Sequence, residues 1–311
     1  MSRRFFLPLL TAAALLAAAP VAATHDDQGA TPSSKDILAA SRPSEWRTLD
    51  PAQTLYMELA DHHRVVIELA PPWAPRHVAN IKTLVDAHYF DGTSVYRVQD
   101  NFVAQWGDPD GDDPDKARPM GTAHTTLPPE FTRTLDETLA VTALPDGDLY
   151  APRVGFSRGL PMAWNPATNT AWLVQCYGMV GVARDTATDS GNGNTLYVPI
   201  GQAPRQIDRQ LAVVGRVVRG MQWLSSLPRG PEPMGVYDDP ARRTRIRSIR
   251  LASQVPETQR VALQVLRTDS KTFARLVEAK RNRHDAFYTR PVGHVGICNV
   301  PLPVREKPAG S

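Results

Sequence analysis

Apolar and polar side chains alternate in short stretches along this chain. In residues 55–59, Leu, Met and Leu alternate with Tyr and Glu, which predicts a strand with one buried face. A second strand is predicted over Arg64–Leu69, and the Asp-His-His sequence between the two predicts a hairpin turn. Comparable patterns predict strands at Ser94–Val98, Phe102–Trp106, Met179–Ala183, Leu196–Ile200, Leu211–Val218 and Arg245–Leu251.

Helical spacing occurs in three places. Pro75 stands where the first turn of a helix accepts proline, and apolar residues follow at helical spacing, so we expect a helix from Pro75 to about His88. A second helix is predicted over Met221–Leu227 and a third over Ser270–Asn282. Most strands follow one another at hairpin-like spacing, without the alternation of strands and helices that builds parallel sheets. We therefore predict a mainly β fold, a closed eight-stranded antiparallel barrel with two capping helices.

The N-terminus has the features of a secretory signal peptide. Arg3 and Arg4 precede an apolar stretch, Phe5–Ala19, and small residues follow at 21–23. The paired arginines also fit a twin-arginine export motif. We expect residues 1–23 to be removed and the mature chain to be periplasmic or secreted, with no stable membrane insertion.

The remaining chain divides by composition. Residues 24–45 resemble a flexible leader, and we expect regular structure from about Leu55 within a barrel domain spanning 46–255. Residues 108–177 hold nine of the 28 prolines and show little periodicity, which predicts a long irregular, acidic insertion. Residues 256–311 are predicted to form a partly helical C-terminal extension.

Cysteine and charge content exclude several classes of protein. Two cysteines cannot build a disulfide-dense scaffold or a four-cysteine zinc site. In an oxidising compartment, Cys176 and Cys298 could form one disulfide or remain two buried thiols, and the sequence leaves both open. A net charge of +3 is too small to indicate nucleic acid as a partner.

Two charged segments invite further interpretations. The acidic run at 108–115 has its glycine at the fourth position, whereas a calcium loop of the EF-hand type needs it at the sixth, so we expect a solvated loop and no metal. A cluster of arginines near the end of the barrel domain is either a solvated strand face or a surface for anionic envelopes. These arginines are Arg242, Arg243, Arg245, Arg247 and Arg250.

The common catalytic signatures are missing from the sequence, including nucleophile elbows, zinc-protease motifs and phosphate-binding loops. One segment differs from its surroundings, because Arg97 ends one predicted strand while Phe102 and Gln105 lie on the next. Strict alternation along that strand would place Phe102 and Gln105 on opposite faces. Periodicity alone therefore does not predict a shared pocket.

The segment nevertheless resembles the cyclophilin signature, F-H-R-V followed by a turn and F-x-x-Q-G-G-D. Tyr96-Arg97-Val98 matches its first part, and Phe102, Gln105, Gly107 and Asp108 match its second. Further pieces of the family pattern appear in order across about 55–251. They are a P-x-x-x-x-N-F-like helix with Pro75 and Asn80, strand motifs at Gly178–Asp185 and Gly193–Ile200, and an L-D-like segment from Ile207 to Val217.

The resemblance implies a peptidyl-prolyl cis/trans isomerase that acts on X–Pro bonds of proline-containing polypeptides and needs no cofactor. Arg97 would be the catalytic residue and would stabilise the twisted bond, and Gln105 would bind the substrate backbone. The other substrate-binding positions implied by the family pattern are Phe102, Val103, Ala183, Tyr197, Ile207 and Leu211.

Some positions depart from the family pattern. Arg184 replaces an asparagine that binds the substrate backbone, Leu211 replaces a histidine, and Gln206 stands where an aromatic residue is common. These departures keep a second hypothesis open, a cyclophilin-like binding or chaperone module with little turnover.

Overall fold

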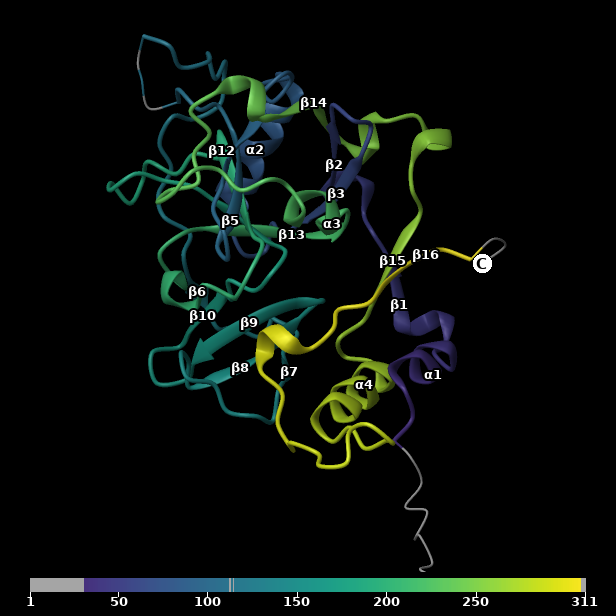
Figure 1. Cartoon of the computed structure of the whole chain (residues 1–311). Coiled ribbons are helices and arrows are strands. Elements are labelled where there is room, and N and C mark those ends of the chain that lie inside the picture. The colour runs from purple at the N-terminus through teal and green to yellow at the C-terminus, as the bar shows by residue number, and fades with distance from the viewer. Residues whose placement is uncertain (1–30, 112, 114, 309–311) are drawn as a thin grey trace, which may run out of the picture. The chain divides into compact units, whose positions relative to one another are not determined.

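The closed barrel predicted from the sequence is present in the computed structural model, which describes residues 31–111, 113 and 115–308. The predicted signal peptide lies outside the described residues. Eight antiparallel strands close the barrel in the order β11-β12-β5-β4-β14-β2-β3-β13 (Figure 1). Their bounds are β2 Thr54–Leu59, β3 Arg64–Leu69, β4 Ser94–Val98, β5 Val103–Gly107, β11 Met179–Val182, β12 Thr195–Pro199, β13 Val213–Arg219 and β14 Thr244–Leu251. Each corresponds to one of the eight predicted strands.

Alternation along these strands decides which side chains fill the barrel. Val65, Trp106 and Val198 are fully buried and belong to one hydrophobic core. Helices α2 (Pro75–Asp86) and α3 (Met221–Ser225) add their apolar faces to that core. Both predicted capping helices are thus confirmed, and the barrel interior is a packed core.

The insertion is more regular than predicted. Its second half forms a five-stranded antiparallel sheet in the order β6-β10-β9-β8-β7. The bounds are β6 Arg133–Thr134, β7 Thr142–Ala143, β8 Arg153–Ser157, β9 Leu160–Asn165 and β10 Thr170–Leu173. The prediction of an irregular insertion is therefore wrong for this half. The sequence did not reveal these strands because two of them have only two residues and β9 contains Pro161.

The two ends of the described chain meet in a three-stranded sheet, β1-β15-β16. The bounds are β1 Trp46–Thr48, β15 Leu263–Leu266 and β16 Val304–Glu306. Helix α1 (Ser34–Ala39) precedes this sheet and contacts α4 (Lys271–Arg281), the third predicted helix. Regular structure therefore begins well before Leu55, contrary to our expectation, and the described part of the predicted leader contains a helix with Ile37 buried.

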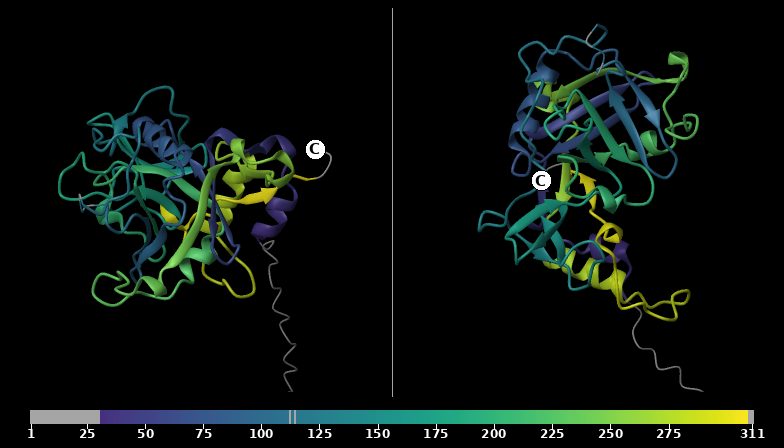
Figure 2. Two further views of the ribbon diagram at one scale, coloured as in Figure 1. Left: turned by 90° about the horizontal axis from the view of Figure 1, so that it is seen from above. Right: turned by 90° about the vertical axis from the view of Figure 1, so that its left-hand side faces the viewer.

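A second core joins the N-terminal segment, the insertion and the C-terminal segment. It includes Ile37, Phe156 and Trp172, together with Phe273 and Ile297. Phe156 of β8 meets Phe273 of α4 edge to face, with ring centroids 5.0 Å apart, where Figure 2 shows α4 beside the sheet of the insertion. The C-terminal extension thus packs with two earlier parts of the chain.

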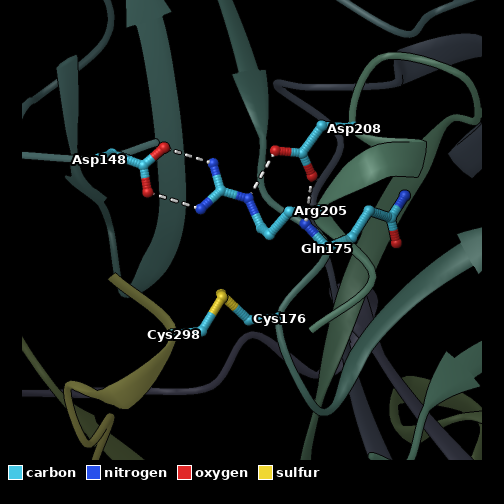
Figure 3. Close-up of a disulfide and its surroundings, with 6 residues drawn as sticks. All are labelled: Asp148, Gln175, Cys176, Arg205, Asp208 and Cys298. Atoms are coloured by element: carbon cyan, nitrogen blue, oxygen red, sulfur yellow. Dashed lines mark hydrogen bonds and ion pairs between the residues drawn. A yellow bond between two sulfur atoms is a disulfide. The ribbon is translucent and has the colours of Figure 1, made fainter. Parts of the chain in front are cut away.

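A disulfide joins two parts of the second core, and a buried ionic network ties the insertion to the barrel. Cys176 and Cys298 form a disulfide between residues 122 positions apart, which resolves the pairing left open by the sequence. Nearby, Arg205 binds Asp148 of the insertion with two hydrogen bonds of 2.7 and 2.9 Å and Asp208 with one of 2.7 Å (Figure 3). All three side chains are more than 90% buried, so this network is shielded from water.

Candidate active site

Strand register places three of the predicted site residues in one row. Arg97 of β4 lies opposite Gln105 of β5, and Gln105 lies opposite Tyr197 of β12. Tyr197 in turn lies opposite Gly181 of β11. Directly opposed residues project from the same face of a sheet. Their neighbours fill the interior, so this row lies on the outer face of the barrel.

A β-bulge at Tyr96 brings a further side chain to this row. The register of β4 against β5 shifts between Val95 and Arg97, which places the bulge at Tyr96. Gln105 consequently binds two consecutive residues: its Oε1 accepts from Nη1 of Arg97 (3.1 Å), and its Nε2 donates to the Tyr96 hydroxyl. The bulge therefore lets one glutamine orient Arg97 while itself being held by Tyr96.

The guanidinium of Arg97 is fixed from two more directions. Its Nε donates to the carbonyl oxygen of Met234 (2.8 Å), and its Nη2 donates to Oε1 of Gln99. Gln99 also donates through Nε2 to the carbonyl of Pro233 (3.0 Å). Of the five guanidinium N–H groups, these bonds to described residues use three and leave one on each terminal nitrogen. Burial holds the pKa of Arg97 below its ordinary value, but an arginine stays charged at neutral pH.

Sequence reasoning missed Gln99 and the loop that carries Pro233 and Met234. The loop lies 137 residues beyond Arg97 in the chain, and it binds Arg97 through a backbone carbonyl that any residue could supply. A local pattern therefore holds no signal for it. Gln99 lies only two residues from Arg97, but an amide in a turn is typical of exposed turns as well.

Phe102 joins the site because it lies outside the strand. β5 begins at Val103, so Phe102 belongs to the preceding turn and escapes the alternation that would separate it from Gln105. Its ring centroid is 5.7 Å from Cζ of Arg97, within the range of a cation–π contact. Val103 is 2% exposed and projects to the same side of β5 as Gln105.

The remaining predicted residues form the surroundings of the row. Tyr197 is only 3% exposed, and its ring lies so close over Gly181 that an added Cβ would overlap it. Burial raises the pKa of the Tyr197 hydroxyl above its usual range. Ile207 and Leu211 are half-buried and take no part in the bonds and ring contact of Arg97 given above.

A cavity of about 420 Å³ opens beside the row, and we call it the groove cavity. Gln105, Tyr96 and Ala183 line it together, and Arg184 stands at its edge. Another wall comes from the first part of the insertion, namely Pro109, Gly111, Ala117, Arg118, Met120, Thr125 and Thr126. The insertion therefore borders the groove beside Gln105.

The acidic run at the start of the insertion stabilises a loop. Asp108 is 5% exposed and accepts the backbone N–H of Asp110 (3.1 Å) and of Arg118 (2.7 Å). Among the residues that the structure describes, no group of three or more histidines, cysteines and carboxylates is arranged to hold a metal ion. The Arg97 row is thus the arrangement that calls for a chemical explanation.

A comparison with protein-family models assigns the chain to a family. Residues 54–251, from the first to the last barrel strand, match the family model described as "Cyclophilin type peptidyl-prolyl cis-trans isomerase/CLD". The chain belongs to the cyclophilin family. The prediction of a peptidyl-prolyl cis/trans isomerase is confirmed at this level.

Individual relatives agree with the family assignment. A "Probable peptidyl-prolyl cis-trans isomerase" of Brucella suis biovar 1 is 29% identical over 189 residues, which cover 59% of this chain and 75% of the relative. "Peptidyl-prolyl cis-trans isomerase B" of Bacillus subtilis is 39% identical over 59 residues, covering 19% of this chain and 41% of the relative. The fold is similar to that of the cyclophilin AquaCyp293 from Hirschia baltica, with a TM-score of 0.66, 24% identity, and coverage of 88% of this chain and 97% of the other.

Compared with the cyclophilin pattern, Arg184 is the departure nearest to the groove cavity. Its Nε donates to the carbonyl of Gln210 (2.8 Å) and its Nη1 to the carbonyls of Asp185 (2.7 Å) and Thr186 (3.0 Å). These bonds hold the side chain against its own loop. Arg184 therefore does not reproduce the backbone-binding role of the family asparagine in this conformation.

The arginine cluster at the end of the cyclophilin barrel is partly engaged in local bonds. Arg250 forms two hydrogen bonds of 2.6 Å with Asp91, and Arg243 donates to the carbonyl of Tyr237 (3.1 Å). Binding to an anionic surface stays an untested prediction. No helix within the described part of the chain has the length and apolar character needed to cross a membrane.

Proposed function

We propose that this cyclophilin catalyses cis/trans isomerisation of X–Pro bonds in exported polypeptides, with Arg97 as the catalytic residue. The observation that carries the proposal is the fixed guanidinium. Gln105, Gln99 and the Met234 carbonyl hold it at the end of the row, and these bonds to the described residues leave one N–H on each terminal nitrogen for a ligand.

The barrier to rotation suits such a group. Resonance between the imide nitrogen and the carbonyl makes the barrier about 18–20 kcal/mol. As the bond twists, the nitrogen regains its lone pair, and a fixed donor can then bind the prolyl nitrogen or carbonyl more strongly than in the planar state. This is preferential stabilisation of the transition state by a preorganised charge. It requires no nucleophile and no proton transfer.

The substrate would lie along the groove cavity, with the proline ring beside Phe102 and Val103. Phe102 offers an apolar face next to the guanidinium, and Tyr197 supplies a buried base for the pocket. Ala183, Ile207 and Leu211 would complete the apolar surroundings. We assign Gln105 mainly to the positioning of Arg97, because both ends of its amide are already engaged.

An isomerisation assay on a short X–Pro peptide tests the proposal. Wild type is expected to accelerate the reaction, and Arg97→Ala is expected to lose about 100-fold or more in kcat/KM, as when a preorganised donor is removed from other enzymes. Arg247→Ala, an exposed arginine on the barrel strand β14, is the matched control and should keep wild-type activity. A wild-type rate no faster than that of solvent, together with binding of the peptide, would favour the alternative binding module.

We further propose export, supported by the signal-like residues 1–23 and by the disulfide, which persists in oxidising compartments. Fractionation of cells that express the full chain should place it outside the cytoplasm. Replacing Arg3 and Arg4 with lysine separates the two routes, since a twin-arginine substrate would then be retained in the cytoplasm. Cytoplasmic location of the unmodified chain would refute export.

A further inference from the structure

A second cavity, of about 490 Å³, lies where three parts of the chain meet, and we call it the junction cavity. One wall is the insertion loop 147–150, and a second is formed by the C-terminal segment 294–299. Tyr177, at the end of the insertion, and the barrel loop 201–205 complete the lining. Cys298 lies in the C-terminal wall, so its disulfide to Cys176 fastens that wall to the end of the insertion.

The buried charged side chains at this cavity are already paired within the protein. Arg205 is bound by Asp148 and Asp208, and its guanidinium lies 4.9 Å from the ring centroid of Tyr150 (Figure 3 shows the two carboxylates). A charged ligand would have to compete with this buried network, which is costly to open. The cavity therefore favours uncharged side chains.

Three large, exposed side chains lie at the mouth of the cavity. Leu149, Tyr150 and Tyr177 are 98%, 53% and 47% exposed, and all three line the cavity. Exposed apolar side chains gathered around a hollow mark a binding surface. Exposed tyrosine rings are suited to proline, aromatic and aliphatic side chains of an extended chain.

The junction cavity and the candidate active site share one bordering loop, residues 200–202. Its wall residue Gly201 lies so close to Asn101 that an added Cβ would overlap the Asn101 backbone, and the N–H of Gln202 donates to Oδ1 of Asn101 (2.8 Å). The neighbouring Ile200 N–H donates to the carbonyl of Phe102 (2.9 Å). One short loop thus borders the Phe102 turn on one side and the junction cavity on the other.

We propose that the junction cavity binds a segment of the polypeptide substrate several residues away from the isomerised proline, by stacking an uncharged apolar side chain or proline on Tyr150 and Tyr177. The proposal rests on the proposed isomerase function. On this proposal the enzyme favours extended chains, because only a chain with residues beyond the Arg97 site can occupy both places.

The test compares a short X–Pro peptide with peptides extended by eight uncharged, Tyr- and Pro-containing residues on either side, a reach of up to about 27 Å. Two variants disturb the cavity in opposite ways. Tyr150→Ser/Tyr177→Ser removes the rings, and Gly147→Trp fills the space, since nothing lies within 4 Å of an added Cβ there. Tyr288→Ser is the control, a tyrosine 42% exposed and outside the cavity.

Both cavity variants should keep wild-type kcat/KM on the short peptide and lose about fivefold or more on one extended peptide, as expected for lost aromatic contacts. The control should change neither. Equal losses on short and extended peptides, or no loss on either, would overturn the proposal. Fluorescence anisotropy with the labelled extended peptide measures binding to the junction cavity independently of catalysis. If the wild type is inactive but the cavity variants selectively lose peptide binding, the isomerase proposal is refuted and the cavity proposal stands.

Discussion

The barrel and the second core are assembled from the chain in different ways. The barrel strands come from two stretches, 54–107 and 179–251, on either side of the insertion, and the site follows from register, because Arg97, Gln105 and Tyr197 are opposed on neighbouring strands. The second core collects segments from both ends of the described chain and from the insertion. Its strand β1 pairs with β15, so Trp46 faces Leu266.

The barrel positions the candidate catalytic residues, whereas the second core holds distant segments of the chain together. A sheet can position catalytic side chains through local pairing alone, whereas distant segments lose more chain entropy on meeting and gain from strong links. The second core includes a disulfide, whereas the barrel is built from hydrogen-bonded strands that also carry a buried ion pair between Arg216 and Glu68. We expect changes in the links to alter stability, and changes in the Arg97 row to alter catalysis.

The largest effect on stability is expected from removal of the disulfide. Cys176→Ser/Cys298→Ser should lower the free energy of unfolding by about 2–4 kcal/mol, because the bridge closes a very long loop in the unfolded chain. Urea unfolding measures this change. Activity on a short X–Pro peptide should stay near that of wild type. A loss of activity in the folded variant would contradict the claim that the disulfide affects stability and not catalysis.

A smaller, pH-dependent effect is expected at Glu45 in the second core. Its carboxylate accepts the backbone N–H groups of Arg42 (2.9 Å) and Thr272 (3.0 Å), and these bonds hold the pKa of Glu45 at about 2, below its ordinary value of 4.5. The resulting stability is complete above about pH 4.5 and is lost as the pH falls toward 2. Glu45→Gln should cost about 1–3 kcal/mol at pH 7.

Urea unfolding at pH 7, 4 and 3 measures this dependence on pH. The gap between wild type and Glu45→Gln should narrow as the pH falls, since wild type alone loses the charged contact. Glu257→Gln, at an exposed position, is the control. A gap that is constant across the three pH values would show that the carboxylate charge does not stabilise the second core.

The smallest effect is expected at Gln105, which positions Arg97. Gln105→Leu should reduce kcat/KM by about tenfold, because the guanidinium loses one of its three anchors and reacting groups are sensitive to small displacements. Gln105→Glu keeps an acceptor for Arg97 and should restore most of the activity. Equal kcat/KM in the two variants would contradict a positioning role. Unfolding free energies should show little change in either.

The parts of the fold that sequence could predict are those with local patterns. Period-two alternation predicted all eight barrel strands, and the resemblance pointed to Arg97 and Gln105 from residues in one hairpin. Strands β6 and β7 escaped because two residues cannot show a period. β1 and β16 have three residues each and depend on β15, so their pairing has no local signature.

The candidate site was predictable to the same extent. The Phe102 ring reaches Arg97 because β5 starts one residue later than predicted, a boundary that alternation could not define. The Met234 carbonyl and the junction cavity depend on contacts between distant segments. Such contacts form only when the chain folds, and no local sequence pattern indicates which distant residues will meet.

The central claim is that the fixed guanidinium of Arg97 performs the chemistry, and the most direct test is kcat/KM of Arg97→Gln beside wild type on one short X–Pro peptide. Unfolding free energies are measured on the same samples. We predict a loss of about 100-fold or more with a folded, equally stable protein. A folded Arg97→Gln variant that isomerises the peptide as fast as wild type would contradict the account.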